Sequence, residues 1–284
     1  MRPPFAYYGS KRRLAQHILQ HIPPHRAFVE LFGGSGAVTL AKAPSPIEVF
    51  NDIFSGVTNF YAVLRNEKLR EQLLEQLRLT PYSREDYQAC AKSWEMCDDP
   101  VEKARQWYFV QANSFNGRFG AGLCISAVKS ANNKPLHISA FLEKIEKLPM
   151  IARRFNNVII ENDDFRKVVK RYDTVGTVFY ADPPYVMRTR NAAGTYHHEA
   201  TLQDHQDLVT LILQSRGKWV VSGYDHEVYA PLEAQGWQKI IIPISTSTVN
   251  YNCSEKNCRE EILWVSPPQT HTAPSQPLTS AGNT

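Results

Sequence analysis

Short apolar runs rich in β-branched residues recur along the chain, and such runs predict strands. Amphipathic segments, for example Leu14–His21 and Leu202–Gln214, lie between several of these runs and predict helices. Because strands that alternate with helices form mostly parallel sheets covered on both faces, the pattern predicts an α/β fold. The last two predicted strands lie close together, which favours an antiparallel hairpin at the edge of the sheet. The predicted strands are Ala27–Phe32, Ile47–Phe50, Val158–Glu161, Thr177–Ala181, Trp219–Ser222, Lys239–Ile242 and Glu261–Val265.

Residues 57–155 interrupt this alternation with successive amphipathic segments that predict helices. A stretch with little periodicity, Phe115 to His137, separates the third helix from the fourth and is expected to be a loop. We interpret the region as a helical insertion that divides an α/β domain into residues 1–56 and 156–266. The tail 267–284 is rich in Pro, Ser and Thr and is expected to be disordered. The predicted helices of the insertion are Val57–Leu79, Arg84–Trp94, Val101–Asn113 and Ile138–Phe155.

The composition is that of an ordinary globular protein, since 43% of the 284 residues are hydrophobic. No apolar run reaches the roughly 18 residues that span a bilayer, and no apolar stretch typical of a signal peptide follows Arg2. The five cysteines are an odd number without the spacing of zinc ligands, so we interpret them as reduced thiols. These observations favour a cytoplasmic protein without a membrane segment or a metal site.

The net charge is only +4, so nucleic-acid binding has to be argued from the distribution of charge. Residues 1–26 contain five basic side chains and no acidic one. The segment 106–142 contains Arg118, Lys129 and Lys134, again without an acid. Such stretches fit contact with a phosphate backbone, and a solvated basic face is the alternative.

A glycine-rich turn, Gly33-Gly34-Ser35-Gly36, follows the first predicted strand and precedes an apolar helical start. Glycine lets the backbone approach a ligand closely, and a strand, a glycine turn and a helix in this order are typical of sites for nucleoside-containing cofactors. Thr39 stands where the dinucleotide fingerprint needs Gly or Ala, and the sequence has no phosphate-binding loop motif. The cofactor is therefore expected to lack a pyrophosphate, which disfavours NAD and ATP.

Several polar positions suit such a cofactor. Asp52 ends the second strand, roughly 20 residues past the glycine turn, where a carboxylate can accept both ribose hydroxyls. Asp164 and Phe165 follow the third strand and offer an acid for an adenine amino group and a ring for packing. Near the N-terminus, Lys11 is suited to a cofactor carboxylate and Tyr8 to packing around the adenosine. The alternatives are helix N-caps for the two acids and a basic arm without a specific role.

The tetrapeptide Asp182-Pro183-Pro184-Tyr185 follows a buried strand, at the sheet edge where open α/β sheets bind their ligands. Two consecutive prolines remove two N–H donors and end the strand. The result is a stiff corner that presents a carboxylate, a carbonyl and an aromatic ring. Together these groups suit a planar base with an exocyclic amino group, and a turn with a purely structural role is the alternative.

Taken in order, these motifs resemble the DNA adenine-N6 methyltransferases of the Dam family, also called the D12 class. The resemblance implies a Rossmann-like sheet that binds S-adenosylmethionine, and an inserted domain that recognises the target. It also implies methyl transfer to a flipped adenine in double-stranded DNA. We expect a monomer. The sequence does not decide whether the enzyme serves a restriction–modification system, a phage or the host. The matching segments are Tyr8–Lys11, Phe28–Gly36, Asn51–Asp52, Asp182–Tyr185, Tyr196–Glu199 with Asp204–His205, and Arg259–Trp264.

The resemblance and the charges together suggest roles for individual residues. Asp182 and the Pro183 carbonyl would each accept an N6–H hydrogen bond, which aims the nitrogen lone pair at the methyl group, and Tyr185 would stack on the base. The predicted catalytic residues are Asp182, Pro183, Pro184 and Tyr185. The predicted cofactor contacts are Tyr8, Lys11, Glu30, Phe32, Gly33, Gly34, Gly36, Asp52, Asp164, Phe165 and Asp182. The predicted DNA contacts are Phe115, Asn116, Arg118, Lys129, Lys134, Arg188 and Arg190.

One motif departs from the family pattern. The family's aromatic-Asn-Gly turn is matched by Phe115-Asn116-Gly117. Four residues past the Asn, where Dam has an arginine that recognises a guanine, this chain has Gly120, and Arg118 lies two residues earlier. The target sequence therefore stays open, with GATC as one candidate.

Rival functions are methylation of cytosine N4 or of RNA adenine, DNA binding without catalysis, and nicotinamide-dependent oxidation. Asp182 favours adenine over cytosine, because cytosine enzymes more often have Ser at the first position of this corner. A module that only binds DNA has no reason to keep both this acid and the glycine turn. The histidines His197, His198 and His205 are interpreted as part of a structural or DNA-facing loop and not as metal ligands.

Overall fold

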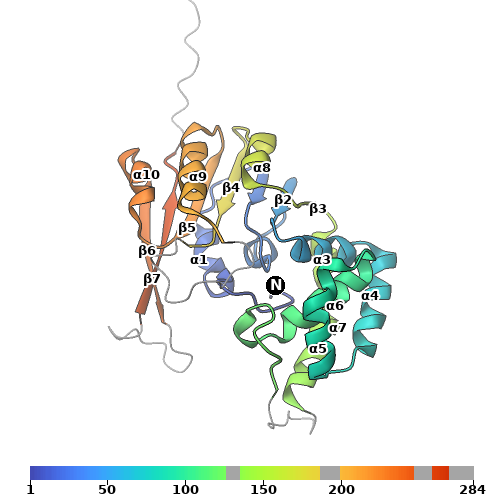
Figure 1. Ribbon diagram of the computed structural model, residues 1–284. Coiled ribbons are helices and arrows are strands. Elements are labelled where there is room, and N and C mark those ends of the chain that lie inside the picture. The colour runs from blue at the N-terminus through green and yellow to red at the C-terminus, as the bar shows by residue number, and fades with distance from the viewer. Residues whose placement is uncertain (126–134, 186–198, 246–257, 269–284) are drawn as a thin grey trace, which may run out of the picture.

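A seven-stranded sheet forms the centre of the described structure, in the order β3-β2-β1-β4-β5-β7-β6 (Figure 1). The computed structural model describes residues 1–125, 135–185, 199–245 and 258–268. The five strands from β3 to β5 in this order are parallel, and β7 runs antiparallel between β5 and β6. The predicted Rossmann-like α/β fold is therefore confirmed. The strands are β1 (Ala27–Glu30), β2 (Ile47–Asn51), β3 (Val158–Glu161), β4 (Thr177–Ala181), β5 (Lys218–Gly223), β6 (Gln238–Ser245) and β7 (Cys258–Val265).

Helices cover both faces of the sheet. Successive strand residues point to opposite faces, and the strands carry apolar residues on each of them. Phe28 packs with Leu14 and Val38 on one face, whereas Val29 packs with Leu208 on the other. Figure 1 shows the second face covered by the last three helices of the chain. The helices on the sheet are α1 (Ala15–Gln20), α2 (Ala37–Ala41), α8 (Phe165–Tyr172), α9 (Leu202–Gln214) and α10 (Ala230–Ala234).

The last two strands pair with each other, as predicted. They are antiparallel over eight residue pairs, from Gln238 with Val265 to Ser245 with Cys258. Both are longer than the apolar runs that predicted them, because the pairing continues into polar residues. Since β7 also pairs with β5, it lies inside the sheet and β6 forms the edge.

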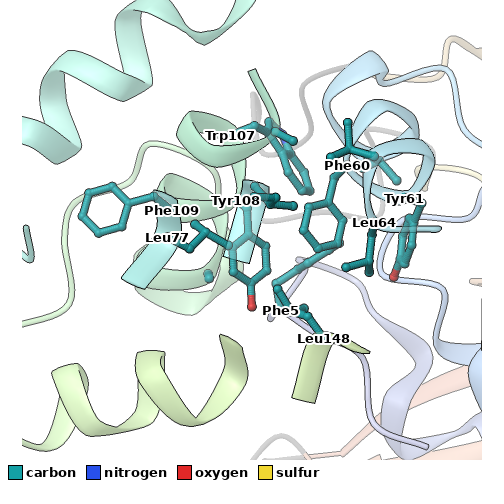
Figure 2. Close-up of a cluster of buried hydrophobic side chains, with 14 of the residues drawn as sticks. Phe5, Phe60, Tyr61, Leu64, Leu77, Trp107, Tyr108, Phe109 and Leu148 are labelled. Carbon is teal, nitrogen blue, oxygen red and sulfur yellow. The ribbon is translucent and has the colours of Figure 1, made fainter. Parts of the chain in front are cut away.

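A second group of helices gathers beside β3 (Figure 1). Its core is aromatic, and Figure 2 shows the fully buried rings of Phe60, Trp107 and Tyr108 at its centre. The rings of Phe60 and Tyr108 stack with centroids 4.7 Å apart. The helices are α3 (Ser55–Arg65), α4 (Glu67–Leu79), α5 (Arg84–Ser93), α6 (Pro100–Asn113) and α7 (Leu136–Phe155).

The predicted continuous helix Val57–Leu79 is wrong, because the chain forms α3 and α4 with a break at Asn66. Asn66 has an extended backbone, and its side chain accepts a hydrogen bond from the Leu69 amide at 3.1 Å. It therefore acts as the N-cap of α4. Apolar residues at helical spacing lie on both sides of the break, and the four polar residues 65–68 between them mark it in the sequence.

The domain boundaries at residues 56 and 155 stay a prediction. Helix α3 begins at Ser55 and α7 ends at Phe155, and the aromatic core also includes Phe50 of β2. Of the predicted tail, residues 269–284 lie outside the described part of the chain. Among the described residues, no helix is both long and apolar enough to cross a membrane.

The N-terminal arm, residues 1–10, lies against α6. Phe5 is buried in the aromatic core of Figure 2. The backbone carbonyls on either side of Phe5 accept hydrogen bonds from the Tyr108 hydroxyl at 3.1 Å and the Gln111 side-chain amide at 2.7 Å. The helical segment therefore holds the arm, which leads directly into Lys11 at the carboxyl end of the sheet.

Candidate functional site

A cavity of about 280 Å³ opens at the carboxyl ends of β1, β2 and β4. Strand order reverses between β1 and β4, and such switch points are where open α/β sheets bind ligands. The cavity brings together most of the residues predicted for the cofactor and for catalysis. Those that line it are Tyr8, Lys11, Glu30, Phe32, Gly33, Gly34, Asp52, Asp164, Phe165, Asp182, Pro183 and Pro184.

The glycine turn forms one wall of the cavity. A Cβ on Gly33 would lie 2.2 Å from the Phe50 ring, so a side chain there would displace a buried aromatic residue. Gly34 has a φ of +49°, and a Cβ there would also approach the Tyr7 ring to 3.0 Å. Gly36 does not line the cavity, because it forms the N-cap of α2. Glycine is therefore required at these two positions by the packing of Phe50 and Tyr7 and by the backbone conformation of Gly34.

The Asp52 carboxylate lies at the cavity wall and is held at both oxygens. Oδ2 accepts a hydrogen bond from the Gly34 amide at 2.6 Å, and Oδ1 accepts one from the Phe54 amide at 2.8 Å. These bonds connect the end of β2 to the glycine turn. A carboxylate oxygen has more than one lone pair, so the group can still accept from a ligand hydroxyl.

Glu30 is buried, and its contacts are internal. Its Oε2 accepts hydrogen bonds from the Thr39 amide at 3.0 Å and from the Thr39 hydroxyl. Burial raises the pKa of Glu30 to about 8, although the Thr39 hydrogen bonds oppose the shift. Thr39, which departs from the dinucleotide fingerprint, therefore joins the end of β1 to α2.

Asp164 and Phe165 lie where β3 leads into α8. The Asp164 Oδ1 accepts a hydrogen bond from the Arg166 amide at 2.8 Å, so this acid is the N-cap that the sequence left as an alternative. The Phe165 ring packs against Phe32 with centroids 5.5 Å apart. Both rings line the cavity and provide an apolar surface for a flat group.

The corner Asp182–Tyr185 follows β4 and is held from two sides. Lys11 Nζ donates to Asp182 Oδ1 at 2.5 Å and to the Tyr185 hydroxyl at 2.6 Å. His205 Nε2 lies 3.0 Å from the Pro184 carbonyl oxygen, and its Nδ1 lies 2.8 Å from the Tyr229 hydroxyl. A donating Nε2 leaves Nδ1 as an acceptor for Tyr229. These contacts fix the orientation of a segment whose prolines supply no donors of their own.

Two further predicted positions are buried. Lys11 lies beside Asp182 at the cavity, and its contact with a cofactor carboxylate stays a prediction. His205, predicted in a loop, is a buried residue of α9. The helix predicted over Leu202–Gln214 already included this position, in conflict with the loop interpretation of the histidine. His197 and His198 lie outside the described residues.

Tyr185 does not line the cavity, because its side chain is buried behind the corner. Its ring packs on the Tyr224 ring with centroids 4.2 Å apart, and its hydroxyl lies 2.9 Å from Glu261 Oε1. Sequence reasoning gave no role to Glu261, although it lies in a matching motif. The predicted stacking of Tyr185 on a base stays a prediction.

Burial also changes the acid–base properties of the corner. Burial raises the pKa of Asp182, and the neighbouring Lys11 ammonium opposes the shift. Burial raises the pKa of Glu261 to about 7, with Lys11 again acting in the opposite direction. Two acids and one ammonium therefore share a small buried volume, which is typical of functional sites.

The predicted DNA contacts that the structure describes adjoin the arm. Phe115 is 59% exposed, and Asn116 has a φ of 54°. The Arg118 guanidinium lies 4.7 Å from the centre of the Tyr8 ring. The turn therefore lies beside a residue of the cavity wall. The remaining predicted contacts, which lie outside the described residues, are Lys129, Lys134, Arg188 and Arg190.

Within the described ranges, no group of three or more His, Cys, Asp or Glu side chains is arranged to hold a metal ion. The carboxylates of the cavity instead pair with Lys11, with Arg166 or with backbone amides. The arrangement presents hydrogen-bond acceptors and apolar rings to a ligand. It is therefore suited to a flat group that carries amino and hydroxyl hydrogens.

Comparison with known proteins adds independent information. Residues 7–241 match the model of a family described as D12 class N6 adenine-specific DNA methyltransferase. Two relatives, from two strains of Vibrio cholerae serotype O1, are both called DNA adenine methylase. Each is 23% identical to this chain over 274 residues, which cover 90% of this chain and 92% of the relative.

Among solved structures, a precorrin 8w decarboxylase of Methanobacterium thermoautotrophicum can be superposed on 94% of this chain and 99% of its own length. Its sequence identity is 11% and the TM-score is 0.37. At that score the likeness carries no argument about this protein.

Proposed function

The chain belongs to the D12 class of N6 adenine-specific DNA methyltransferases, and from that premise we propose that it uses S-adenosylmethionine to methylate N6 of an adenine flipped out of double-stranded DNA. The observation that carries this proposal is the position of Asp182. Asp182 directly follows β4, and it lines the cavity that the glycine turn and Asp52 also line. A base in contact with this acid would therefore lie beside a nucleoside-binding site.

The cavity fits S-adenosylmethionine by the chemistry of its walls. The two carboxylates suit hydroxyl and amino hydrogens, and the pair Phe32 and Phe165 suits an adenine ring. Asp52 would hold the ribose, and Asp163 or Asp164 the adenine amino group. When bound, this cofactor supplies a sulfonium methyl group whose bonding electrons stay on sulfur after transfer.

Asp182 and the Pro183 carbonyl would orient the target nitrogen. Adenine N6 is a poor nucleophile, because its lone pair is delocalised into the ring. Two fixed acceptors for its hydrogens pull the amino group towards a tetrahedral geometry and stabilise the charge that develops on it. Lys11 and His205 keep this corner in place, so little reorganisation is needed at the moment of reaction.

The turn Phe115–Gly117 is proposed to face DNA. The Tyr8 amide donates to the Gly117 carbonyl at 3.2 Å, which holds the turn close to the cavity. An exposed aromatic ring and the nearby Arg118 suit contact with bases and phosphates. We also propose that the protein acts as a monomer. The helical segment 57–155 is accordingly proposed as the target-recognition domain.

We expect purified protein to transfer a labelled methyl group from S-adenosylmethionine to duplex DNA, with the label recovered as N6-methyladenine after digestion to nucleosides. The protein would then be expressed in a methylation-free bacterium. Sequencing the DNA of this bacterium would map the methylated adenines and show whether the target sequence is GATC. Label on cytosine N4, label on RNA only, or DNA binding without any product would each contradict the proposal.

Asp52→Ala should weaken cofactor binding by about tenfold to a hundredfold, the loss expected for hydrogen bonds to a charged group. The substitution also releases the Gly34 and Phe54 amides, which the carboxylate holds. Titration calorimetry with S-adenosylmethionine measures the effect. Asp225→Ala is the matched control, because Asp225 is 70% exposed and pairs with Lys239 away from the cavity. Equal affinities in the two variants would contradict the assignment.

A further inference from the structure

A buried acid, Glu261, lies behind the catalytic corner and takes no part in the proposed steps above. It lies in β7, and its side chain is 2% exposed. The Tyr185 hydroxyl lies 2.9 and 3.0 Å from its two oxygens, and Lys11 Nζ lies 3.4 Å from Oε1. Burying a carboxylate is costly, so its place beside the corner calls for a reason in the chemistry.

Hydrogen bonds connect Asp182 to Glu261 without a break. The first joins Lys11 Nζ to Asp182 Oδ1 at 2.5 Å, and the second joins Lys11 Nζ to the Tyr185 hydroxyl at 2.6 Å. The third joins that hydroxyl to Glu261 Oε1 at 2.9 Å. Each distance is short enough for proton transfer along this series of hydrogen bonds.

Methylation of an amino group produces a proton that must leave the nitrogen. We propose that Glu261 is the final acceptor of the proton released from adenine N6, delivered through Asp182, Lys11 and Tyr185; this inference rests on the function proposed above. Glu261 touches no substrate and acts only through these neighbours, so it is a positioning residue.

Every proton in this transfer has both a donor and an acceptor among the named groups. The N6 lone pair forms the new N–C bond, and the electrons of one N6–H bond return to N6 as its proton passes to Asp182. The Tyr185 hydroxyl gives its proton to Glu261, and Lys11 gives one of its protons to Tyr185. The lone pair that this leaves on Lys11 Nζ then takes the proton from Asp182. Lys11 and Tyr185 end with as many protons as they began with. Asp182 is again a carboxylate, and Glu261 is a neutral acid.

The surroundings of Glu261 suit an acceptor that works near neutral pH. The titratable and charged groups that face it in the described structure are Lys11, Asp182, Tyr185 and Tyr229. Burial raises the pKa of Glu261 to about 7, Lys11 lowers it and Asp182 raises it further. Above that pH the group is a carboxylate and can take a proton, and below it the group is already protonated.

The test is single-turnover transfer of labelled methyl to duplex DNA over a range of pH, with the full chain. The wild-type rate should fall as the pH drops through about 7. Glu261→Gln should be at least about tenfold slower and should lose this acid limb, since loss of general acid–base catalysis typically costs a hundredfold or more. Tyr185→Phe removes the relay hydroxyl but keeps the ring and should behave in the same way. The double variant should be no slower than either single variant.

Glu260→Gln is the matched control, because Glu260 is the exposed neighbour on the same strand. It should keep the wild-type rate and the fall in rate below about pH 7. A Glu261→Gln protein with an unchanged limb and a rate within about twofold of wild type would overturn the relay. Wild-type protein that makes no labelled product would instead refute the proposed function.

A second measurement does not depend on activity. In protein labelled with ¹³C at glutamate carboxyl carbons, the resonance missing from Glu261→Gln should titrate near pH 7 in the wild type. Titration of that resonance in the ordinary glutamate range would contradict the relay. If Glu261→Gln fails to fold, the Tyr185→Phe pH profile decides the question: a retained acid limb overturns the relay, and its loss supports it.

Discussion

Asp182→Ala is expected to slow methyl transfer by about a thousandfold, the upper end of the loss seen when a preorganised hydrogen-bond partner of a transition state is removed. The carboxylate directly follows β4 at the cavity, where it can accept a hydrogen bond from N6–H without moving. Affinity for S-adenosylmethionine should change by no more than a few-fold, because Asp52 and the glycine turn are untouched. Single-turnover transfer and calorimetry measure the two effects separately.

The fold should survive this substitution. Lys11 keeps Glu261 as a nearby acid at 3.4 Å and the Tyr185 hydroxyl at 2.6 Å, so its charge is not left alone in the interior. Asp182→Asn retains an oxygen acceptor without the charge and should fall between the wild type and the alanine variant. A rate for Asp182→Ala similar to that of the exposed control Asp225→Ala would show that the corner has another function.

Phe5→Ala should lower the free energy of unfolding by about 3–5 kcal/mol, as other truncations of buried aromatic residues do. The ring lies edge-on to Trp107 at 5.1 Å and to Phe60 at 5.7 Å, in the centre of the cluster in Figure 2. It also anchors the N-terminal arm, so Tyr8 and Lys11 should lose their fixed positions. We therefore expect weaker cofactor binding and slower transfer together with the loss of stability, as measured by urea unfolding and calorimetry.

Leu77→Ala separates the two effects of this substitution. Leu77 is fully buried in α4 in the same cluster, and its truncation should cost about 2–5 kcal/mol. It does not hold the arm, so affinity for the cofactor should stay close to that of the wild type at temperatures where the protein is folded. If both variants lose affinity equally, the arm has no special role in positioning the site.

Much of the cavity could be predicted because parallel strands bring their carboxyl ends to one edge. Asp52 and Asp182 are 130 positions apart in the sequence, yet each directly follows a strand, and the two strands flank β1. Apolar β-branched runs marked those strands without any knowledge of the fold. The glycine turn was recognisable from its position between a strand and a helix, whereas its close packing against Phe50 and Tyr7 is visible only in the structure.

Contacts that depend on side-chain choices were less predictable. From the sequence, Asp164 could either cap α8 or bind a ligand. Only the structure shows that it accepts a hydrogen bond from the Arg166 amide. Asn66 breaks a helix within a run of four polar residues, and such a run can also lie on the exposed face of a continuous helix. Glu261 lies 76 positions from Tyr185, and nothing in the sequence says that β7 inserts between β5 and β6, which brings this acid to the corner.

The most direct test of the central claim is a crystal structure of the protein with duplex DNA and a non-reactive analogue of S-adenosylmethionine. We expect the target adenine to lie outside the DNA helix, with N6 about 3 Å from the Asp182 carboxylate and from the Pro183 carbonyl oxygen. We also expect the analogue to lie between Asp52 and Phe165. A corner that points away from the analogue, or an N6 with other partners, would contradict it.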